Sequence, residues 1–284
     1  MKQFAVLVFA AGAFGAALQL CAQDPAGPPP VLQIVAENIK EGKGAAHEKS
    51  EATFMQAAAK FHFPAHVLGL TSITGTSQAW FLEAYDNFAA IMDSRAAMNK
   101  PELSGIDAAD ADLRTGSRSL IAAFRPDLSY AVDKAQLVKS RFFTVVTIQT
   151  RAGQSPAFDE LAKFLIAGAE KSRDPTSVLT YQVVSGAADG TYLLLEPMES
   201  LRAMDEARQA EPALRQALGE EGMKRWAKMS ADTIRSEESI LFSVNPRMSY
   251  VPKEWIAADP EFWGPKPAQT PKARKTGAKT TASK

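Results

Sequence analysis

The chain has 284 residues, 46% of them hydrophobic, and it balances 32 basic against 32 acidic side chains. This composition excludes a disordered polyelectrolyte and suffices for one or two ordinary domains. Cys21 is the only cysteine. A mature chain that lacks it would have no disulfide, no thiol nucleophile and no cysteine metal site.

The first 22 residues have the pattern of a signal peptide. Lys2 precedes an apolar run over residues 4–18, which is short for a membrane span. Cleavage after Ala22 is expected, with residues 23–30 as a Pro-rich spacer. The chain is therefore expected to be periplasmic or secreted, with no transmembrane span after processing.

Two alternatives exist for this segment. A lipoprotein site would use Cys21, although Leu20 stands where a small residue is preferred. A buried N-terminal helix is the other.

The C-terminal residues 264–284 carry six basic side chains and no acidic one, in a Pro-, Thr-, Ala- and Lys-rich setting that predicts disorder. Setting these six and Lys2 aside leaves 25 basic against 32 acidic side chains, so the body of the chain is acidic. The sequence favours a solubilising tail, and contact with an anionic envelope is the alternative. No sequence-specific nucleic-acid partner is expected.

The chain contains an internal repeat. The segment SLIAAFRPDLSY (Ser119–Tyr130) returns as SILFSVNPRMSY (Ser239–Tyr250), 120 positions later. FPAHVLGL at residues 63–70 matches DPTSVLTY at an offset of 111, and WFLEAYDNF at residues 80–88 matches LLLEPMESL at an offset of 113. The offset grows only between elements, as loop insertions would make it grow. These matches indicate a duplicated domain.

Each copy has the same order of elements. VLQIVAENI (31–39) and FFTVVTIQT (142–150) are rich in β-branched residues and are expected to form the first strands. A helix follows, with Ser155 as its expected N-cap in the second copy. A hairpin of two strands, a second helix opening at Asp86 or Glu199, and a fourth strand complete each copy.

The order β-α-β-β-α-β, found twice, predicts two ferredoxin-like repeats in an α+β fold. We expect repeat 1 over residues 31–130, a linker over 131–140 and repeat 2 over 141–250. Each sheet would cover one face with helices and pack the other against its partner as a pseudo-dimeric α/β barrel. An aromatic strap over residues 251–263 is expected to lie on the barrel, with partner docking as the alternative.

Over Val31–Tyr250 the chain resembles the dimeric α/β-barrel superfamily, particularly antibiotic-biosynthesis-monooxygenase-like domains in fused form. The resemblance is carried by element order and by strands such as AWFLEAYDNFAAIMD, without a diagnostic catalytic motif. It implies a superfamily that includes cofactor-free monooxygenases, haem-degrading enzymes, isomerases and proteins with no known chemistry. Fold is therefore a poor guide to function.

The resemblance to haem-degrading members implies an Asn, a Trp and a His around a pocket. Asn38 and Trp80 could supply two, but no histidine follows on the second helix of repeat 1. His62 and His66 flank a helix-breaking proline and match no helical metal motif. The sequence therefore predicts neither a metal nor a cofactor.

Polar residues that stand out collect in repeat 1, where Glu37, Asn38 and His47 are weak catalytic candidates. If its strand face lines the barrel, Glu37 would have a raised pKa suited to proton transfer. The sequence favours instead an ordinary ion pair for Glu37 and a surface or N-terminal helical position for His47. Trp80 and Tyr85 are weak candidates for a ligand-cavity wall, with a core role favoured.

Three functions follow from these patterns. The first is an exported, non-catalytic or ligand-binding barrel that holds a small apolar molecule. The second is a cofactor-independent monooxygenase or isomerase with its site in repeat 1, and the third is an envelope interaction module that uses the basic tail.

Overall fold

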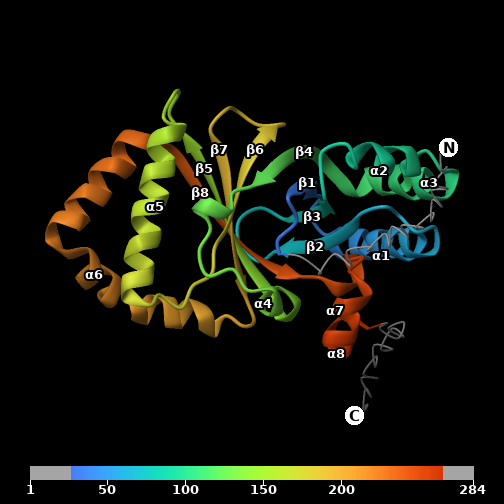
Figure 1. The fold of residues 1–284 in the computed structure, drawn as a ribbon. Coiled ribbons are helices and arrows are strands. Elements are labelled where there is room, and N and C mark those ends of the chain that lie inside the picture. Colours follow the sequence, from blue (N-terminus) through green and yellow to red (C-terminus); the bar gives the residue numbers. More distant parts are fainter. Residues whose placement is uncertain (1–26, 265–284) are drawn as a thin grey trace, which may run out of the picture.

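The computed structural model describes residues 27–264. The expected signal peptide, half of the spacer and nearly all of the basic tail lie outside this range. Within it, eight strands form a closed barrel in the order β1-β3-β2-β8-β5-β7-β6-β4. Helices of the two repeats cover the barrel on opposite sides, as Figure 1 shows. The predicted pair of ferredoxin-like repeats is confirmed.

Both repeats contain the predicted strands and helices. Repeat 1 comprises β1 (Val31–Ile39), α1 (Gly44–Lys60), β2 (His66–Ser72), β3 (Gln78–Tyr85), α2 (Ile91–Met98), α3 (Pro101–Asp110) and β4 (Arg114–Phe124). Repeat 2 comprises β5 (Phe142–Thr150), α5 (Ser155–Ser172), β6 (Leu179–Ser185), β7 (Thr191–Met198), α6 (Arg202–Thr233) and β8 (Ile234–Val244). Between the repeats lies the short helix α4 (Lys134–Lys139).

Two local predictions were wrong. The second helices do not open at Asp86 and Glu199 but at Ile91 and Arg202, and that of repeat 1 is divided into α2 and α3. Pro101 begins α3, because proline suits a first helical turn but not a helix interior. At the start of α5 the N-cap is Gln154, without a side-chain capping bond, so Ser155 already belongs to the helix.

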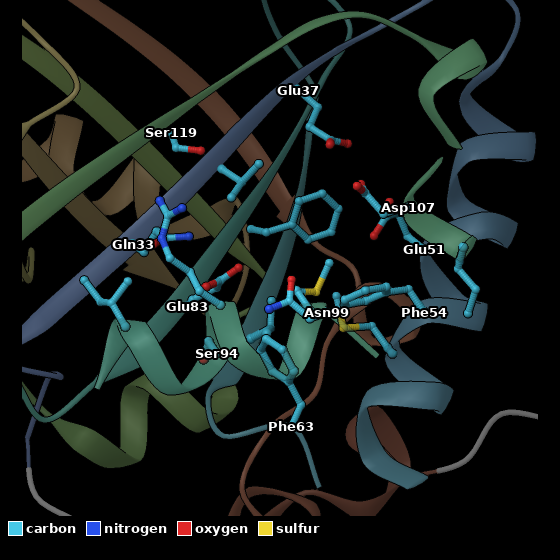
Figure 2. A pocket seen from close by; sticks show the side chains of 18 of the residues that line it. Gln33, Glu37, Glu51, Phe54, Phe63, Glu83, Ser94, Asn99, Asp107 and Ser119 are labelled. Carbon is cyan, nitrogen blue, oxygen red and sulfur yellow. The ribbon is translucent and has the colours of Figure 1, made fainter. Parts of the chain in front are cut away.

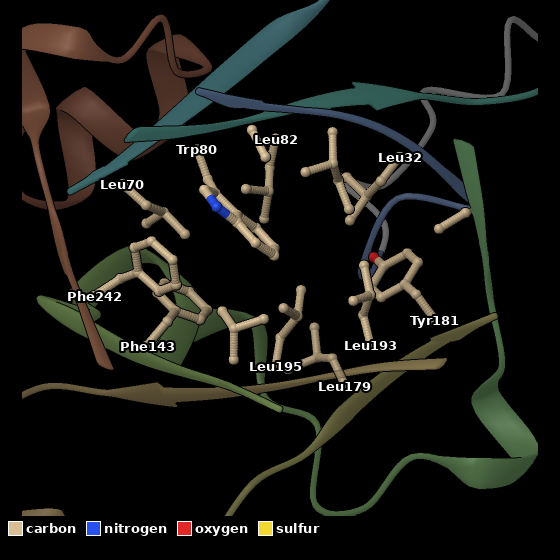
Figure 3. Close-up of a cluster of buried hydrophobic side chains, with 14 of the residues drawn as sticks. Leu32, Leu70, Trp80, Leu82, Phe143, Leu179, Tyr181, Leu193, Leu195 and Phe242 are labelled. Carbon is tan, nitrogen blue, oxygen red and sulfur yellow. The ribbon is translucent and has the colours of Figure 1, made fainter. Parts of the chain in front are cut away.

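The barrel interior is filled by apolar side chains from both repeats. On β1, Leu32, Ile34 and Ala36 point inward, and the alternate residues lie under the helices of repeat 1. Trp80 of β3 packs against Phe242 of β8 with ring centroids 5.2 Å apart. Figure 3 shows this cluster. The interior is therefore a hydrophobic core that joins the two repeats.

The recurring twelve-residue segment forms the two seams between the repeats. The Ser129 hydroxyl accepts a 2.9 Å hydrogen bond from the Thr180 amide of β6 and donates to the Arg125 carbonyl. At the other seam the Ser249 hydroxyl does the same with the Gly69 amide of β2 and the Asn245 carbonyl. The segment recurs because each copy has to join its fourth strand to the other repeat.

The aromatic strap forms two short helices, α7 (Lys253–Ala258) and α8 (Pro260–Trp263). Trp263 is buried against the barrel core and its indole Nε1 donates a 2.8 Å hydrogen bond to the Val138 carbonyl. The Arg141 guanidinium lies 3.7 Å from the centre of the Phe262 ring. The strap thus packs on the barrel. Within residues 27–264, no helix is both long and apolar enough to span a membrane.

Candidate functional site

A cavity of about 680 Å³ lies in repeat 1, between the outer face of its sheet and the helices α1, α2 and α3. It is separate from the filled barrel interior. Much of its wall is apolar, formed by Val35, Phe54, Met55, Phe63, Val67, Phe81, Ile91, Met92, Met98 and Ile106. The exposed residues Met92 and Arg95 of α2, with Asn99 just after it, form its rim. The volume and the mixed lining are typical of a small-molecule site.

One end of this cavity is polar and carries a buried cluster of ionisable groups. Glu37 on β1 is 3% exposed, and its Oε2 lies 2.7 Å from Nε2 of His47 on α1. Its Oε1 accepts a hydrogen bond from the Arg114 guanidinium at the start of β4. Figure 2 shows the carboxylates of Glu37, Glu51 and Asp107 at this end. One strand carboxylate therefore bridges a histidine and an arginine.

Two more carboxylates complete the buried cluster. Glu51 is one turn after His47 on α1, with its Oε1 3.8 Å from Nε2. Asp110, at the end of α3, has a side chain only 1% exposed, and its Oδ2 lies 3.5 Å from His47 Nε2 and 3.3 Å from Arg114 Nε. We call Glu37, His47, Glu51, Asp110 and Arg114 the polar cluster.

Burial changes the acidity of these carboxyl groups. It raises the pKa of Glu51 to about 8, and the neighbouring Glu37 and Asp110 add to the effect. Burial also raises the pKa of Asp110, although His47 and the nearby Ser50 hydroxyl favour its ionised form. At neutral pH, Glu51 is consequently protonated for much of the time. A carboxyl group with such a pKa can both give and take a proton.

A second polar group lies on the sheet wall of the cavity. Burial raises the pKa of Glu83 on β3, against the opposing effects of the Tyr85 hydroxyl and of Arg95. The Tyr85 hydroxyl donates a 2.5 Å hydrogen bond to Glu83 Oε2. Opposite Glu83, Gln33 has a buried Oε1 that accepts no hydrogen bond from the described residues. This oxygen is available to a donor group on a ligand.

Repeat 2 provides an internal comparison for the polar cluster. At the offsets of the duplication, Glu37 corresponds to Ile148, His47 to Phe158 and Glu51 to Ala162, while Arg114 and Ile234 each begin the fourth strand. All four counterparts belong to, or pack against, the hydrophobic core of repeat 2. The same fold is therefore built with apolar residues where repeat 1 buries charges, so the fold itself does not require them.

The structure brings together only part of the predicted site. Glu37 and His47 are in contact, and His47 is buried rather than exposed because α1 packs its first turns onto the sheet. Glu37 lies under the helices and not in the barrel. Asn38 is exposed at the end of β1.

The aromatic candidates take other positions. Trp80 points into the barrel core and Tyr85 lies beneath the helices, where it supports Glu83. Neither of them forms the cavity wall. Asn38 likewise does not line this cavity.

Sequence reasoning missed Glu51, Asp110 and Arg114. A signal was present for Arg114, because Ile234 replaces it at the offset of 120, and for Glu51, because Ala162 replaces it at 111. A search for polar residues with apolar counterparts in the other repeat would have found both. Asp110 corresponds to Ser230, which is also polar, so this comparison would have singled out Asp110 less clearly.

Comparison with protein-family models gave no match, and comparison with curated proteins gave none. Solved structures do match. A "putative monooxygenase" from Fusobacterium nucleatum aligns with a TM-score of 0.51 and 13% identity, over 76% of this chain and 93% of the other. A "putative monooxygenase" from Lactobacillus acidophilus aligns at 0.49 and 8%, over 76% and 94%.

Chlorite dismutase from Candidatus Nitrospira defluvii also matches, with a TM-score of 0.47 and 12% identity, over 81% of this chain and 94% of the other. At such low identity these likenesses concern the fold alone. The likeness to the Fusobacterium nucleatum structure, together with the closed eight-stranded barrel, identifies the fold as a dimeric α/β barrel. This chain has it in fused form, with both halves in one polypeptide.

Proposed function

We propose that the protein binds a small, mostly apolar molecule in the cavity of repeat 1, with a hydrogen-bond donor or cationic group of that molecule directed at the polar end. The observation that carries this proposal is the contrast between the repeats. Repeat 2 fills the corresponding region with an apolar core, whereas repeat 1 keeps a lined cavity and buries charges beside it. Burial of unmatched charge is costly, and a role in binding accounts for that cost.

Native mass spectrometry of the protein purified from its source tests this function. We expect one retained small molecule per chain. Val35→Phe extends a side chain into the cavity and should reduce occupancy at least tenfold, whereas Val184→Phe changes an exposed residue of β6 and should leave occupancy unchanged. Equal occupancy in both variants would place the ligand elsewhere.

Proton transfer on the bound molecule, as in a cofactor-independent isomerase or monooxygenase, is the second candidate. The pKa of about 8 at Glu51, in the cavity wall, favours it. Glu51→Gln should then slow conversion of the retained molecule about 10²-fold or more while the molecule still binds. A non-catalytic binding protein would leave the molecule unchanged with or without Glu51.

Export is proposed from the sequence pattern of residues 1–22. Intact-mass measurement of the protein from its source should give a chain that begins at Gln23. A mass that retains a diacylated Cys21 would support the lipoprotein alternative instead.

A further inference from the structure

The polar cluster has the composition and spacing of a transition-metal site. One ligand atom from each of Glu37, His47, Glu51 and Asp110 lies within 4.8 Å of the other three. Two of the three distances from His47 Nε2, 3.5 Å and 3.8 Å, are close to the edge of a coordination polyhedron with bonds of about 2.1 Å. The third, 2.7 Å to Glu37, is a hydrogen bond that a metal ion would replace by a small outward shift.

A second observation points to a cation at this place. The Asp110 side chain is 99% buried, since only 1% of it is exposed, and within residues 27–264 neither of its oxygens accepts a hydrogen bond of normal geometry, although the Ser50 hydroxyl is near enough to favour the ionised form. Its contacts with Arg114 and His47 are longer, at 3.3 and 3.5 Å. Buried carboxylates are normally satisfied by donors or by metal ions. Asp110 Oδ2 is directed at His47 and Arg114.

The charge of the cluster is consistent with a divalent ion. Glu37, Glu51 and Asp110 carry three negative charges when ionised, and Arg114 compensates one of them. A divalent cation cancels the remaining two and leaves His47 neutral, as a metal-bound imidazole must be.

The surroundings supply support and access. Arg114 bonds Glu37 through Oε1 and leaves Oε2 for the ion, so that it would act as the outer partner that orients a ligating carboxylate. Glu37 and Glu51 line the cavity, which gives an ion a path from the α2 rim. The four ligands come from α1, β1 and α3, three elements of the same repeat.

We propose that Glu37, His47, Glu51 and Asp110 bind one divalent first-row transition-metal ion at the polar end of the repeat 1 cavity. One imidazole with three carboxylates suits Zn²⁺, Mn²⁺, Fe²⁺ or Co²⁺ better than Mg²⁺ or Ca²⁺, which prefer oxygen ligands. The inference goes beyond ligand binding and does not depend on it, because the metal can be titrated with the cavity otherwise empty.

The test uses the full chain, purified without a polyhistidine tag, treated with a chelator and titrated calorimetrically with Zn²⁺ in the presence of excess Mg²⁺. We expect one equivalent per chain. Glu51→Ala introduces the residue that repeat 2 has at this position. It should lower the affinity for Zn²⁺ at least tenfold. His62→Asn removes an exposed histidine and is the matched control, with binding unchanged.

A second test uses the wild-type protein, so its result does not depend on whether a variant folds. The chain has three histidines, so its imidazole proton signals can be followed individually by nuclear magnetic resonance. During a titration with Mn²⁺, the His47 signal should broaden at a lower ion concentration than those of His62 and His66. The proposal is overturned if no stoichiometric Zn²⁺ binds, if His62→Asn abolishes binding, or if all three signals broaden together.

Discussion

His47 and Glu37 join α1 to β1 through a buried 2.7 Å contact, at the place where Phe158 and Ile148 belong to the apolar core of repeat 2. The duplication therefore offers two solutions for the same pair of positions. One is a well-packed core and the other is a charge network beside a cavity. Because both repeats fold alike, the difference between them reports on function more directly than either repeat alone.

Removing the arginine of this network should be costly. Arg114→Met leaves the buried carboxylates of Glu37 and Asp110 without their shared cation, and we expect a loss of about 3 to 5 kcal/mol in the free energy of unfolding. Denaturant unfolding at pH 7 measures it. Arg215→Met, which breaks an exposed ion pair on α6, is the control and should cost about 1 kcal/mol or less. If Arg114→Met lowered the free energy of unfolding as little as Arg215→Met does, Arg114 would not stabilise the buried carboxylates.

Because of the cavity, the same substitution at two equivalent valines should change the free energy of unfolding by different amounts. Val35 faces the cavity of repeat 1, and Val146 packs against the core of repeat 2 at the same sheet position. Val35→Phe should leave the unfolding free energy nearly unchanged, whereas Val146→Phe should overpack the core and cost about 1 to 3 kcal/mol. Thermal unfolding of the two variants provides the comparison, and equal losses would mean that the cavity is not open in solution.

The seam serines should contribute equally because they make equivalent bonds. Ser129→Ala or Ser249→Ala removes the acceptor of a strand amide, and each change should cost about 1 to 2 kcal/mol in denaturant unfolding. Ser239 also recurs as Ser119, but it is exposed. Ser239→Ala should therefore change stability by less than about 0.5 kcal/mol. A similar effect at all three serines would argue against the seam role.

Glu196 should make stability depend on pH. Burial, with contributions from Asp174 and Glu237, raises its pKa from 4.5 to about 7. The folded state thus binds a proton more tightly than the unfolded state, and its stabilisation is complete below pH 4.5 and lost as pH rises to 7.

Glu196→Gln should remove this dependence. We expect the variant to exceed the wild type by roughly 2 to 4 kcal/mol at pH 8, relative to their difference at pH 4. The exposed Glu160→Gln serves as the control and should follow the wild-type profile in urea unfolding measured across this range. Parallel profiles for Glu196→Gln and the wild type would contradict the assignment.

The fold could be predicted from the sequence because each strand and helix occurs twice, as two different sequence segments with the same pattern. The offsets of 111, 113 and 120 align strands and helices, and the first strands were predicted with the bounds that β1 and β5 have. The break between α2 and α3 was not predicted, and neither was the kink of α6 at Gly219, whose backbone angles are not helical.

The site was harder to predict because both faces of β1 are covered. Strand alternation separates Glu37 from Leu32 and Ile34 but does not say which face lies inside the barrel. The burial of His47 depends on how α1 packs on the sheet, and the contribution of Asp110 depends on where α3 ends. Such information lies in tertiary packing and not in local pattern.

The central claim is that the charges of repeat 1 serve binding and not folding. It is tested most directly by a fivefold variant that carries the residues of repeat 2, Glu37→Ile, His47→Phe, Glu51→Ala, Asp110→Ser and Arg114→Ile. Denaturant unfolding of this variant should give a free energy equal to or above that of the wild type, because a buried charge network replaced as a whole by uncharged residues costs little, while ligand and Zn²⁺ binding are lost. A variant that unfolds more easily by several kcal/mol, or that still binds as the wild type does, would contradict the claim.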